Sequence, residues 1–302
     1  MSAPAPRLFD RALLRRRLAR ARGATKAGAP GADFLLARAA ADLTERLGAV
    51  LRPFSRPLDL GTPGNHFAEA LVASAGIGAV TQAGFAESGA ARALVVDEEC
   101  LPFADASFDL IVSGLALQAV NDLPGALTQI RRALQPDGLF LAALIGGRTL
   151  QELRAAFAQA ESDLTGGASP RVAPFADIRD LGGLLQRAGF ALPVTDVDTV
   201  TVRYADMFAL MRDLRAMGAT NPLTERARKP HARAVLMRAA QVYAENFTDA
   251  DGRVRATFDI IWLSGWAPHA SQQQPLKPGS ARARLADALG AAELAAGEKA
   301  GR

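Results

Sequence analysis

The sequence predicts an α/β fold built on a largely parallel sheet. Through the middle of the chain, short apolar runs alternate with segments whose apolar residues recur at helical spacing. This alternation is typical of repeated strand–helix–strand units. The run at residues 56–65 (RPLDLGTPGN) also indicates a buried strand, a glycine turn and a helix. A doubly wound domain holds a nucleotide-like cofactor at such a turn.

The elements can be justified in chain order from apolar spacing and turn residues. Strands are expected at residues 57–60, 79–82, 93–96, 108–113 and 139–145, with helices at 67–74 and 123–134 and a turn at 135–138. Beyond these, helices are expected at 149–164, 178–188, 207–217 and 232–247, and strands at 194–204 and 257–266. Five parallel strands followed by this pattern predict a seven-stranded sheet whose last strand inserts antiparallel.

The same pattern divides the chain into three parts. We expect a basic helical extension at residues 1–50, a domain at 51–270 and a C-terminal tail at 271–302. Within the domain, a helical insertion at about residues 205–255 is expected beside the carboxyl ends of the strands, where ligands bind in open α/β sheets.

The composition is that of an ordinary globular protein. Hydrophobic residues make up 49% of the 302 positions and charged residues 22%. No apolar run is long enough to span a bilayer. The single cysteine, Cys100, excludes a disulfide framework and fits a reducing compartment. Its apolar neighbours predict a buried, inert thiol.

Arginines crowd the start of the chain. Seven of them lie between positions 7 and 22, with Asp10 as the only acid. Three interpretations stay open: a solvated amphipathic helix with Leu8, Leu14 and Leu18 on its inner face, a surface for an anionic partner, and a mitochondrial presequence. Nucleic acid is disfavoured because no aromatic side chains are interleaved for base stacking.

A series of ordered motifs resembles class I S-adenosylmethionine-dependent methyltransferases. The motifs are residues 97–103 (DEECLPF), 107–109 (SFD), 120–124 (VNDLP), 134–138 (LQPDG), 146–154 (GGRTLQELR), 180–182 (DLG), 217–221 (MGATN) and 265–269 (GWAPH). Together with residues 8–11 (LFDR), they identify the chain as a member of the complex I assembly factor 5 family. Its bacterial members are labelled methyltransferases and lie close to malonyl-carrier-protein methyltransferases.

This resemblance carries expectations about fold, cofactor, partner and location. It implies the Rossmann-like class I methyltransferase fold, with S-adenosylmethionine as cofactor, and a role in assembling respiratory NADH dehydrogenase. The mitochondrial member is described as hydroxylating an arginine on a complex I subunit. The implied location is the bacterial cytoplasm, or the mitochondrial matrix in a eukaryote.

The resemblance also implies cofactor-binding positions. The matching residues are Asp59, Gly61 and Gly64 after the first strand, Asp97 and Glu98 after the third, and Gln118 after the fourth. Asp97 corresponds to the acid that contacts the adenine amino group in this family. Its alternative role is that of a helix or turn cap.

Several positions depart from the family pattern. Pro63 and Asn65 replace loop glycines, and Gly84 stands where an acid would bind the ribose hydroxyls. Gln118 and Ala119 replace a His-Trp pair. Each change removes a glycine, a charge or an aromatic surface, so we expect cofactor affinity to be weakened or lost. Asn65 has the alternative role of capping the next helix.

Candidates on the acceptor side lie near strand ends or on the insertion. They are Arg148, Glu152, Tyr204, Asn221, Trp266 and His269, of which Glu152, Asn221 and His269 are the candidates for catalysis. Glu152 could bind a guanidinium or act as a base; its alternative is a solvated helix carboxylate near Arg154. No metal site is expected, because the three histidines, His66, His231 and His269, are widely separated.

We therefore expect a methyltransferase-like protein that acts on a protein substrate or on a subunit of NADH dehydrogenase. The alternatives are a non-catalytic assembly factor with a degenerate cofactor pocket, and a carrier-protein methyltransferase. We expect no nucleic-acid partner and no transmembrane segment. A peripheral contact through the basic N-terminus stays open.

Overall fold

The computed structural model describes residues 7–26, 32–74, 76–85, 93–227 and 232–273, together with positions 287 and 290. Residues 1–268 form one compact unit and residues 269–302 a second one. The helices and strands below belong to the first unit. His231 lies outside the described residues. No helix of the described part of the chain has the length and apolar character needed to cross a membrane.

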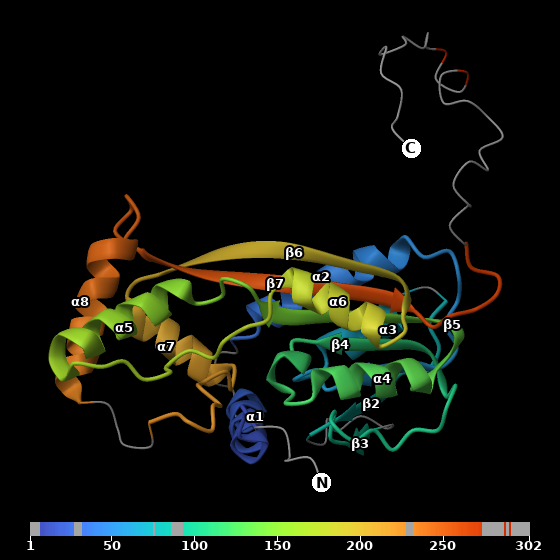
Figure 1. Ribbon diagram of the computed structural model, residues 1–302, viewed down its shortest axis with the longest axis horizontal. Helices are drawn as coiled ribbons and strands as arrows, with labels where there is room; N and C mark the ends of the chain where they lie inside the picture. The colour runs from blue at the N-terminus through green and yellow to red at the C-terminus, as the bar shows by residue number, and fades with distance from the viewer. Residues whose placement is uncertain are drawn as a thin grey trace, which may run out of the picture. The chain divides into compact units, whose positions relative to one another are not determined.

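A seven-stranded sheet forms the centre of the first unit (Figure 1). Its strands are β1(Pro57–Leu60), β2(Thr81–Gly84), β3(Ala93–Val95), β4(Phe108–Gly114), β5(Leu134–Gly146), β6(Ala191–Tyr204) and β7(Val254–Trp266). The order is β3-β2-β1-β4-β5-β7-β6, and β7 runs antiparallel to both β5 and β6. The predicted topology is thus confirmed. Strands β1 and β4 are neighbours, and the chain continues from β1 toward one edge of the sheet and from β4 toward the other. The carboxyl ends of these two strands therefore mark the switch point, where such sheets bind ligands.

The predicted turn at residues 135–138 is wrong as a separate element. Strand β5 already begins at Leu134, and its pairing with β4 shifts register between the Phe108 and Leu110 pairs. Asp137 adopts a φ of 62° within this stretch. Residues 135–138 therefore form a bulge-like irregularity inside β5, because β5 pairs with β4 on both sides of them.

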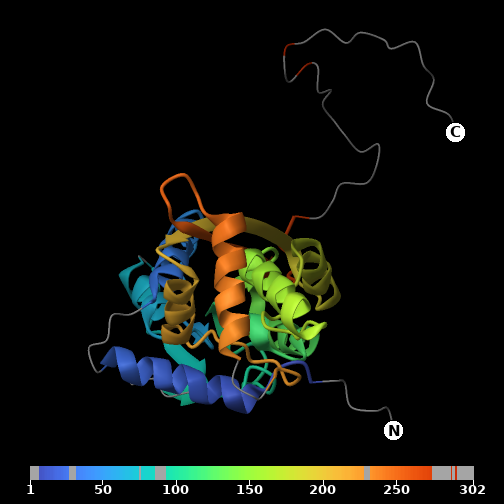
Figure 2. The ribbon, with the colours of Figure 1, turned by 90° about the vertical axis from the view of Figure 1, so that its left-hand side faces the viewer.

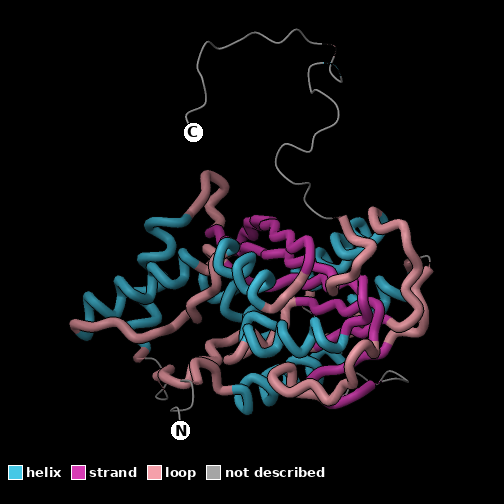
Figure 3. Tube along the Cα trace, turned by 45° about the vertical axis from the view of Figure 1, so that its right-hand side comes forward, coloured by secondary structure: helices cyan, strands magenta, loops and turns pink. Residues whose placement is uncertain are grey.

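Helices cover both faces of the sheet (Figure 3). Helices α2(Phe34–Gly48) and α3(His66–Ala73) bury apolar residues in one core, and α4(Leu123–Ala133) and α6(Ile178–Arg187) bury theirs in the other. Helix α2 falls within the expected N-terminal extension, yet it packs on the sheet. The expected domain boundaries stay a prediction.

Four further helices lie toward the carboxyl ends of the strands. They are α1(Arg11–Lys26), α5(Gln151–Thr165) and the two helices of the insertion, α7(Met207–Ala216) and α8(Arg233–Phe247). Figure 2 shows α1, in dark blue, along the lower edge of the unit near the insertion. The chain before α1 pairs with residues after α7 through a Phe9–Leu223 bridge. Contrary to expectation, Leu8 is exposed.

The single cysteine also differs from expectation, because Cys100 is exposed. It lies in the turn after the edge strand β3, where its N–H bonds to the Asp97 carbonyl at 2.9 Å. That turn directs Leu101, the next residue, into the core. Neighbouring apolar residues therefore did not determine the exposure of the thiol.

A buried carboxylate fixes the entry to β1. Asp109 in β4 accepts hydrogen bonds from the Ser55 N–H at 2.7 Å, the Ser55 hydroxyl at 2.9 Å and the Arg56 N–H at 2.9 Å. Each of these bonds has a carboxylate oxygen as its acceptor, and bonds to carboxylates are stronger than those between neutral groups. The SFD motif thus holds the segment before β1 against β4.

We expect Asp109→Ala to lower the free energy of unfolding by about 2–4 kcal/mol, because it leaves partly buried N–H groups without an acceptor. Urea unfolding followed by circular dichroism measures this loss. Ser55→Ala removes only the hydroxyl donor and should cost about 1 kcal/mol or less. Equal losses in the two variants would contradict this account.

Candidate functional site

The turn after β1 contains two glycines with left-handed backbone conformations, and at Gly61 it is packed too tightly for a side chain. Gly61 and Gly64 have φ values of +77° and +103°, a region that favours glycine. A Cβ atom on Gly61 would lie 2.8 Å from Glu98 Oε1, and one on Gly84 would lie 3.1 Å from the Gly61 Cα. The close approach of β2 to the turn therefore favours glycine at position 84.

Asp59 braces this turn from beneath. Its buried carboxylate accepts a hydrogen bond from the Thr62 hydroxyl, whose oxygen accepts the Gly114 N–H at 2.8 Å. Burial raises the pKa of Asp59 to about 7, although Thr62, Gln82 and Arg22 act to lower it. Asp59 thus ties the end of β1 to the end of β4.

The acids after β3 are bound by an arginine of α1. Arg11 donates to Asp97 Oδ1 at 2.8 Å and to Glu98 Oε2, and its guanidinium lies 3.8 Å from the centre of the Phe85 ring. The Glu98 side chain is 3% exposed, against 47% for Asp97. Burial raises the pKa of the Glu98 carboxyl, while Arg11 acts to lower it. Asp97 also caps the local turn by accepting the Glu99 N–H.

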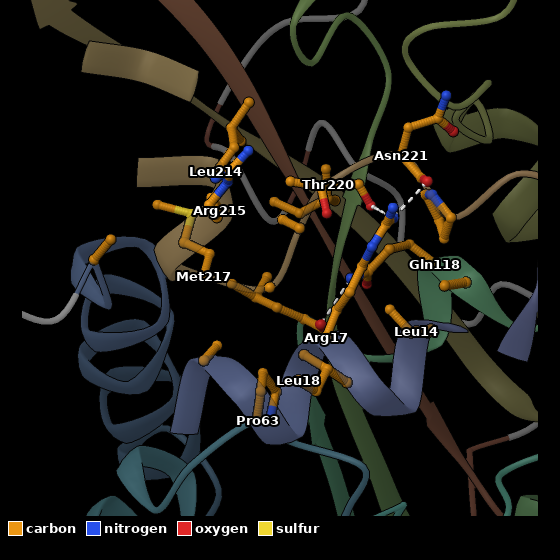
Figure 4. Close-up of a pocket in the computed structure, with 18 of the residues that line it drawn as sticks. Leu14, Arg17, Leu18, Pro63, Gln118, Leu214, Arg215, Met217, Thr220 and Asn221 are labelled. Atoms are coloured by element: carbon orange, nitrogen blue, oxygen red, sulfur yellow. Dashed lines mark hydrogen bonds between the residues drawn. The ribbon is translucent and has the colours of Figure 1, made fainter. Parts of the chain in front are cut away.

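A cavity of about 1170 Å³ extends from this turn to the insertion. Its wall includes α1, whose Leu14 and Leu18 face it as predicted, and the MGATN motif after α7 (Figure 4). Arg17 donates to the carbonyls of Thr220 at 2.7 Å and Asn221 at 2.5 Å. Burial lowers the pKa of the Arg17 guanidinium, and the charges of nearby arginines lower it further.

The predicted cofactor residues divide between the cavity wall and the layer beneath it, apart from Asp97, which does not line the cavity and is 47% exposed. Gly61, Gly64, Glu98 and Gln118 line the cavity, whereas Asp59 lies below the turn. Gln118 donates to the Leu115 carbonyl at 2.7 Å, and its own oxygen is buried without a partner among the described residues. Asn65 occupies the N-cap position of α3, but its side chain makes no capping bond.

The acceptor-side candidates are not brought together. Glu152 is buried, and both its oxygens accept hydrogen bonds from Thr257, so the solvated alternative is wrong. Asn221 lines the cavity, but its amide is engaged with Pro170 and Leu223. His269 belongs to the second unit and contacts Ser271.

The remaining candidates, Arg148, Tyr204 and Trp266, do not line the cavity. Arg148 is held by Asp259, to which its backbone N–H donates at 2.7 Å. Among the described residues, no group of three histidine, cysteine or acidic side chains could hold a metal ion.

Sequence reasoning missed two groups on the cavity wall. The first is the set of inward-facing arginines of α1, whose spacing from Leu14 and Leu18 could have revealed them. The second is His66, whose Nε2 lies 3.0 Å from the Asp33 carboxylate. Its Nδ1 is buried and has no hydrogen-bond partner among the described residues. No motif signals this pair, because Asp33 comes from a different helix.

Comparison with known proteins agrees with this architecture. A family model described as "Methyltransferase domain" matches residues 34–193. The chain is 38% identical over 263 residues to arginine-hydroxylase NDUFAF5, mitochondrial, of Danio rerio, covering 84% of this chain and 82% of that protein. It is 36% identical over 287 residues to a malonyl-[acyl-carrier protein] O-methyltransferase of Methylovorus sp., covering 89% and 93%.

A solved structure shares the fold. The YcgJ protein of Bacillus subtilis superposes with a TM-score of 0.52 at 15% identity, covering 77% of this chain and 99% of that one. The sheet order and the turn after β1 define a class I methyltransferase fold. The chain belongs to the methyltransferase-domain family and, within it, to the complex I assembly factor 5 family.

S-adenosylmethionine is the cofactor of this methyltransferase family, and the residues fit it only in part. Gly61 lines the cavity without a side chain, as the close approach of such a cofactor to the turn requires. The nucleoside end does not fit as it stands, because Arg11 already holds Asp97 and Glu98 and covers Phe85.

We expect the stability of the protein to fall as pH rises from about 4 to about 7. Asp59 keeps its proton to higher pH in the folded chain than its usual pKa of 3.8 allows. The contribution of Asp59 to the free energy of unfolding is therefore complete below pH 3.8 and is lost as the pH rises to about 7. It amounts to at most about 4 kcal/mol. Asp59→Asn should flatten this fall in urea unfolding measured across the window. Asp180→Asn, an exposed substitution on α6, should leave the fall unchanged; an unaltered fall in Asp59→Asn would contradict the assignment.

Proposed function

We propose that this chain is an S-adenosylmethionine-dependent methyltransferase that modifies a group on a protein partner during assembly of NADH dehydrogenase. The observation that carries the proposal is the cavity, which joins the turn after β1 to the helical insertion. At about 1170 Å³ it exceeds the roughly 300–1,000 Å³ usual for a single small ligand. It has room for a cofactor and for part of an acceptor.

The cavity wall changes character along its length. Near the turn it carries the Gly61 backbone, Glu98 and Gln118; toward the insertion it carries apolar side chains such as Phe175, Met211 and Met217. The apolar part excludes water and orients an entering acceptor group. When bound, the cofactor supplies an already activated methyl group, so positioning by these residues provides most of the rate.

Calorimetric titration of the purified protein with S-adenosylmethionine and S-adenosylhomocysteine tests this function. We expect binding in the micromolar to millimolar range, with a rise in melting temperature, because ligands that bind the folded state stabilise it. Deletion of the gene should also lower the amount of assembled NADH dehydrogenase. A protein that restores assembly but binds neither ligand at millimolar concentration would instead be a non-catalytic assembly factor.

A second candidate is favoured by the charge of the cavity, and it concerns the acceptor. Of the residues that the structure describes, eight arginines and three acids line the cavity. Within the described part of the chain, Arg17, Arg20, Arg212 and Arg215 form no ion pair with a carboxylate. A guanidinium acceptor, as the name of the arginine-hydroxylase relatives suggests for them, would meet like charge here. A carboxylate acceptor, like that of the malonyl relatives, would be attracted.

The chemistry of the methylated product separates these acceptors. With a radiolabelled methyl group, we expect a product that releases volatile methanol in mild alkali, because a methyl ester hydrolyses and an N-methyl group does not. Arg212→Gln with Arg215→Gln should raise KM for the acceptor, whereas Arg179→Gln with Arg187→Gln on α6, outside the cavity, should not. An alkali-stable label would contradict the carboxylate acceptor.

A further inference from the structure

The contacts of Arg11 converge on one spot at the carboxyl ends of the strands. The Phe85 ring follows β2, Asp97 and Glu98 follow β3, and the Ala119 carbonyl, which accepts from Arg11 at 3.2 Å, follows β4. These strands flank the switch point of the sheet, where nucleotides bind in doubly wound folds. The Arg11 side chain is only 12% exposed there.

The chemistry that holds Arg11 is also the chemistry that recognises an adenine nucleoside. A guanidinium is flat, stacks on an aromatic face and donates N–H groups to carboxylates. An adenine ring is flat as well, stacks on the same kind of face and donates its amino group to an acid. The two groups thus need the same ring and the same acidic oxygens.

We propose that Arg11 occupies the nucleoside subsite of this protein, so that an adenine nucleoside binds only when Arg11 leaves. The proposal rests on the proposed function, because the competing ligand is the nucleoside of S-adenosylmethionine. Arg11 is then a residue that sets cofactor affinity. The apparent affinity falls in proportion to the fraction of molecules in which Arg11 has left the subsite.

The rest of α1 opposes the departure of Arg11. Arg17 donates hydrogen bonds to the carbonyls of Thr220 and Asn221. Leu18 packs closely against Gly218, so that a Cβ atom on this glycine would lie only 3.1 Å from the Leu18 side chain. Departure of Arg11 would also leave Glu98 buried without its partner charge, unless the ligand replaced it. In the absence of ligand, both effects favour the arrangement in which Arg11 occupies the subsite.

Calorimetric titration of S-adenosylhomocysteine into the full-length protein and its Arg11 variants tests this competition. We expect Arg11→Ala to bind S-adenosylhomocysteine at least about tenfold more tightly than the unaltered chain does. This factor follows if Arg11 has left the subsite in about one tenth of the unaltered molecules. Arg11→Gln, whose amide can still donate to Glu98, should show the same direction and guards against a failure of Arg11→Ala to fold. Arg15→Ala, exposed on the same helix, should leave affinity unchanged.

Hydrogen exchange provides the second readout. Ligand should speed the exchange of α1 amides in the unaltered chain, because it breaks the contacts of Arg11. If both Arg11 variants bind the ligand equally or more weakly, and the ligand slows the hydrogen exchange of α1, then Arg11 contacts the cofactor directly. That result would overturn the competition and leave the proposed function standing. Absence of binding by the unaltered chain and by both variants would overturn both proposals. Binding by the variants alone would support the competition.

Discussion

The structure of the site depends on one steric constraint, the contact between the backbones where β1 and β2 end. Gly84 and Gly61 approach so closely that a Cβ on either would meet backbone or the Glu98 carboxylate. An acid at position 84, which the family pattern leads one to expect, would require the turn to shift by a few tenths of an ångström. The missing ribose acid is therefore linked to tight packing. What looks in the sequence like loss of a cofactor contact is, in the fold, also a close approach that glycine accommodates without a shift of the turn.

The same crowding explains why α1 matters. Glycine stands at position 84, and the acids that the described residues place at this subsite are Asp97 and the buried Glu98. Glu98 needs a partner because an isolated buried charge is costly. Arg11 meets that need from the N-terminal helix. Its neighbours on the inner face, Leu14 and Leu18, cover apolar wall, so one helix supplies both the counter-charge and the packing.

The fold class was predictable because the strand–helix alternation that defines it is a local pattern in the sequence. The outcome at residues 135–138 was not predictable, since the pairing of β5 with β4 is interrupted there and resumes on both sides. In the site, the residues of the glycine turn were visible in the sequence. The pairing of Arg11 with Glu98 spans 87 positions and was not visible. Helical spacing does place Arg11 on the same face as Leu14 and Leu18. The charge of Arg11, taken by itself, favoured a side chain exposed to solvent. The burial of Glu152 likewise depends on Thr257 in a distant strand.

Helix α1 also links the two ends of the cavity. Arg11 binds the acids after β3, and Arg17, about 9 Å further along the helix axis, binds the carbonyls that follow α7. Because a helix moves as a rigid element, a displacement that frees Arg11 also strains or breaks the bonds of Arg17. Those bonds position the MGATN segment, which lines the cavity together with Arg212 and Arg215. A nucleoside that replaces Arg11 and an acceptor that binds near Arg17 therefore act on the same two positions of α1. If both ligands favour the displaced helix, each must strengthen the binding of the other by an equal factor.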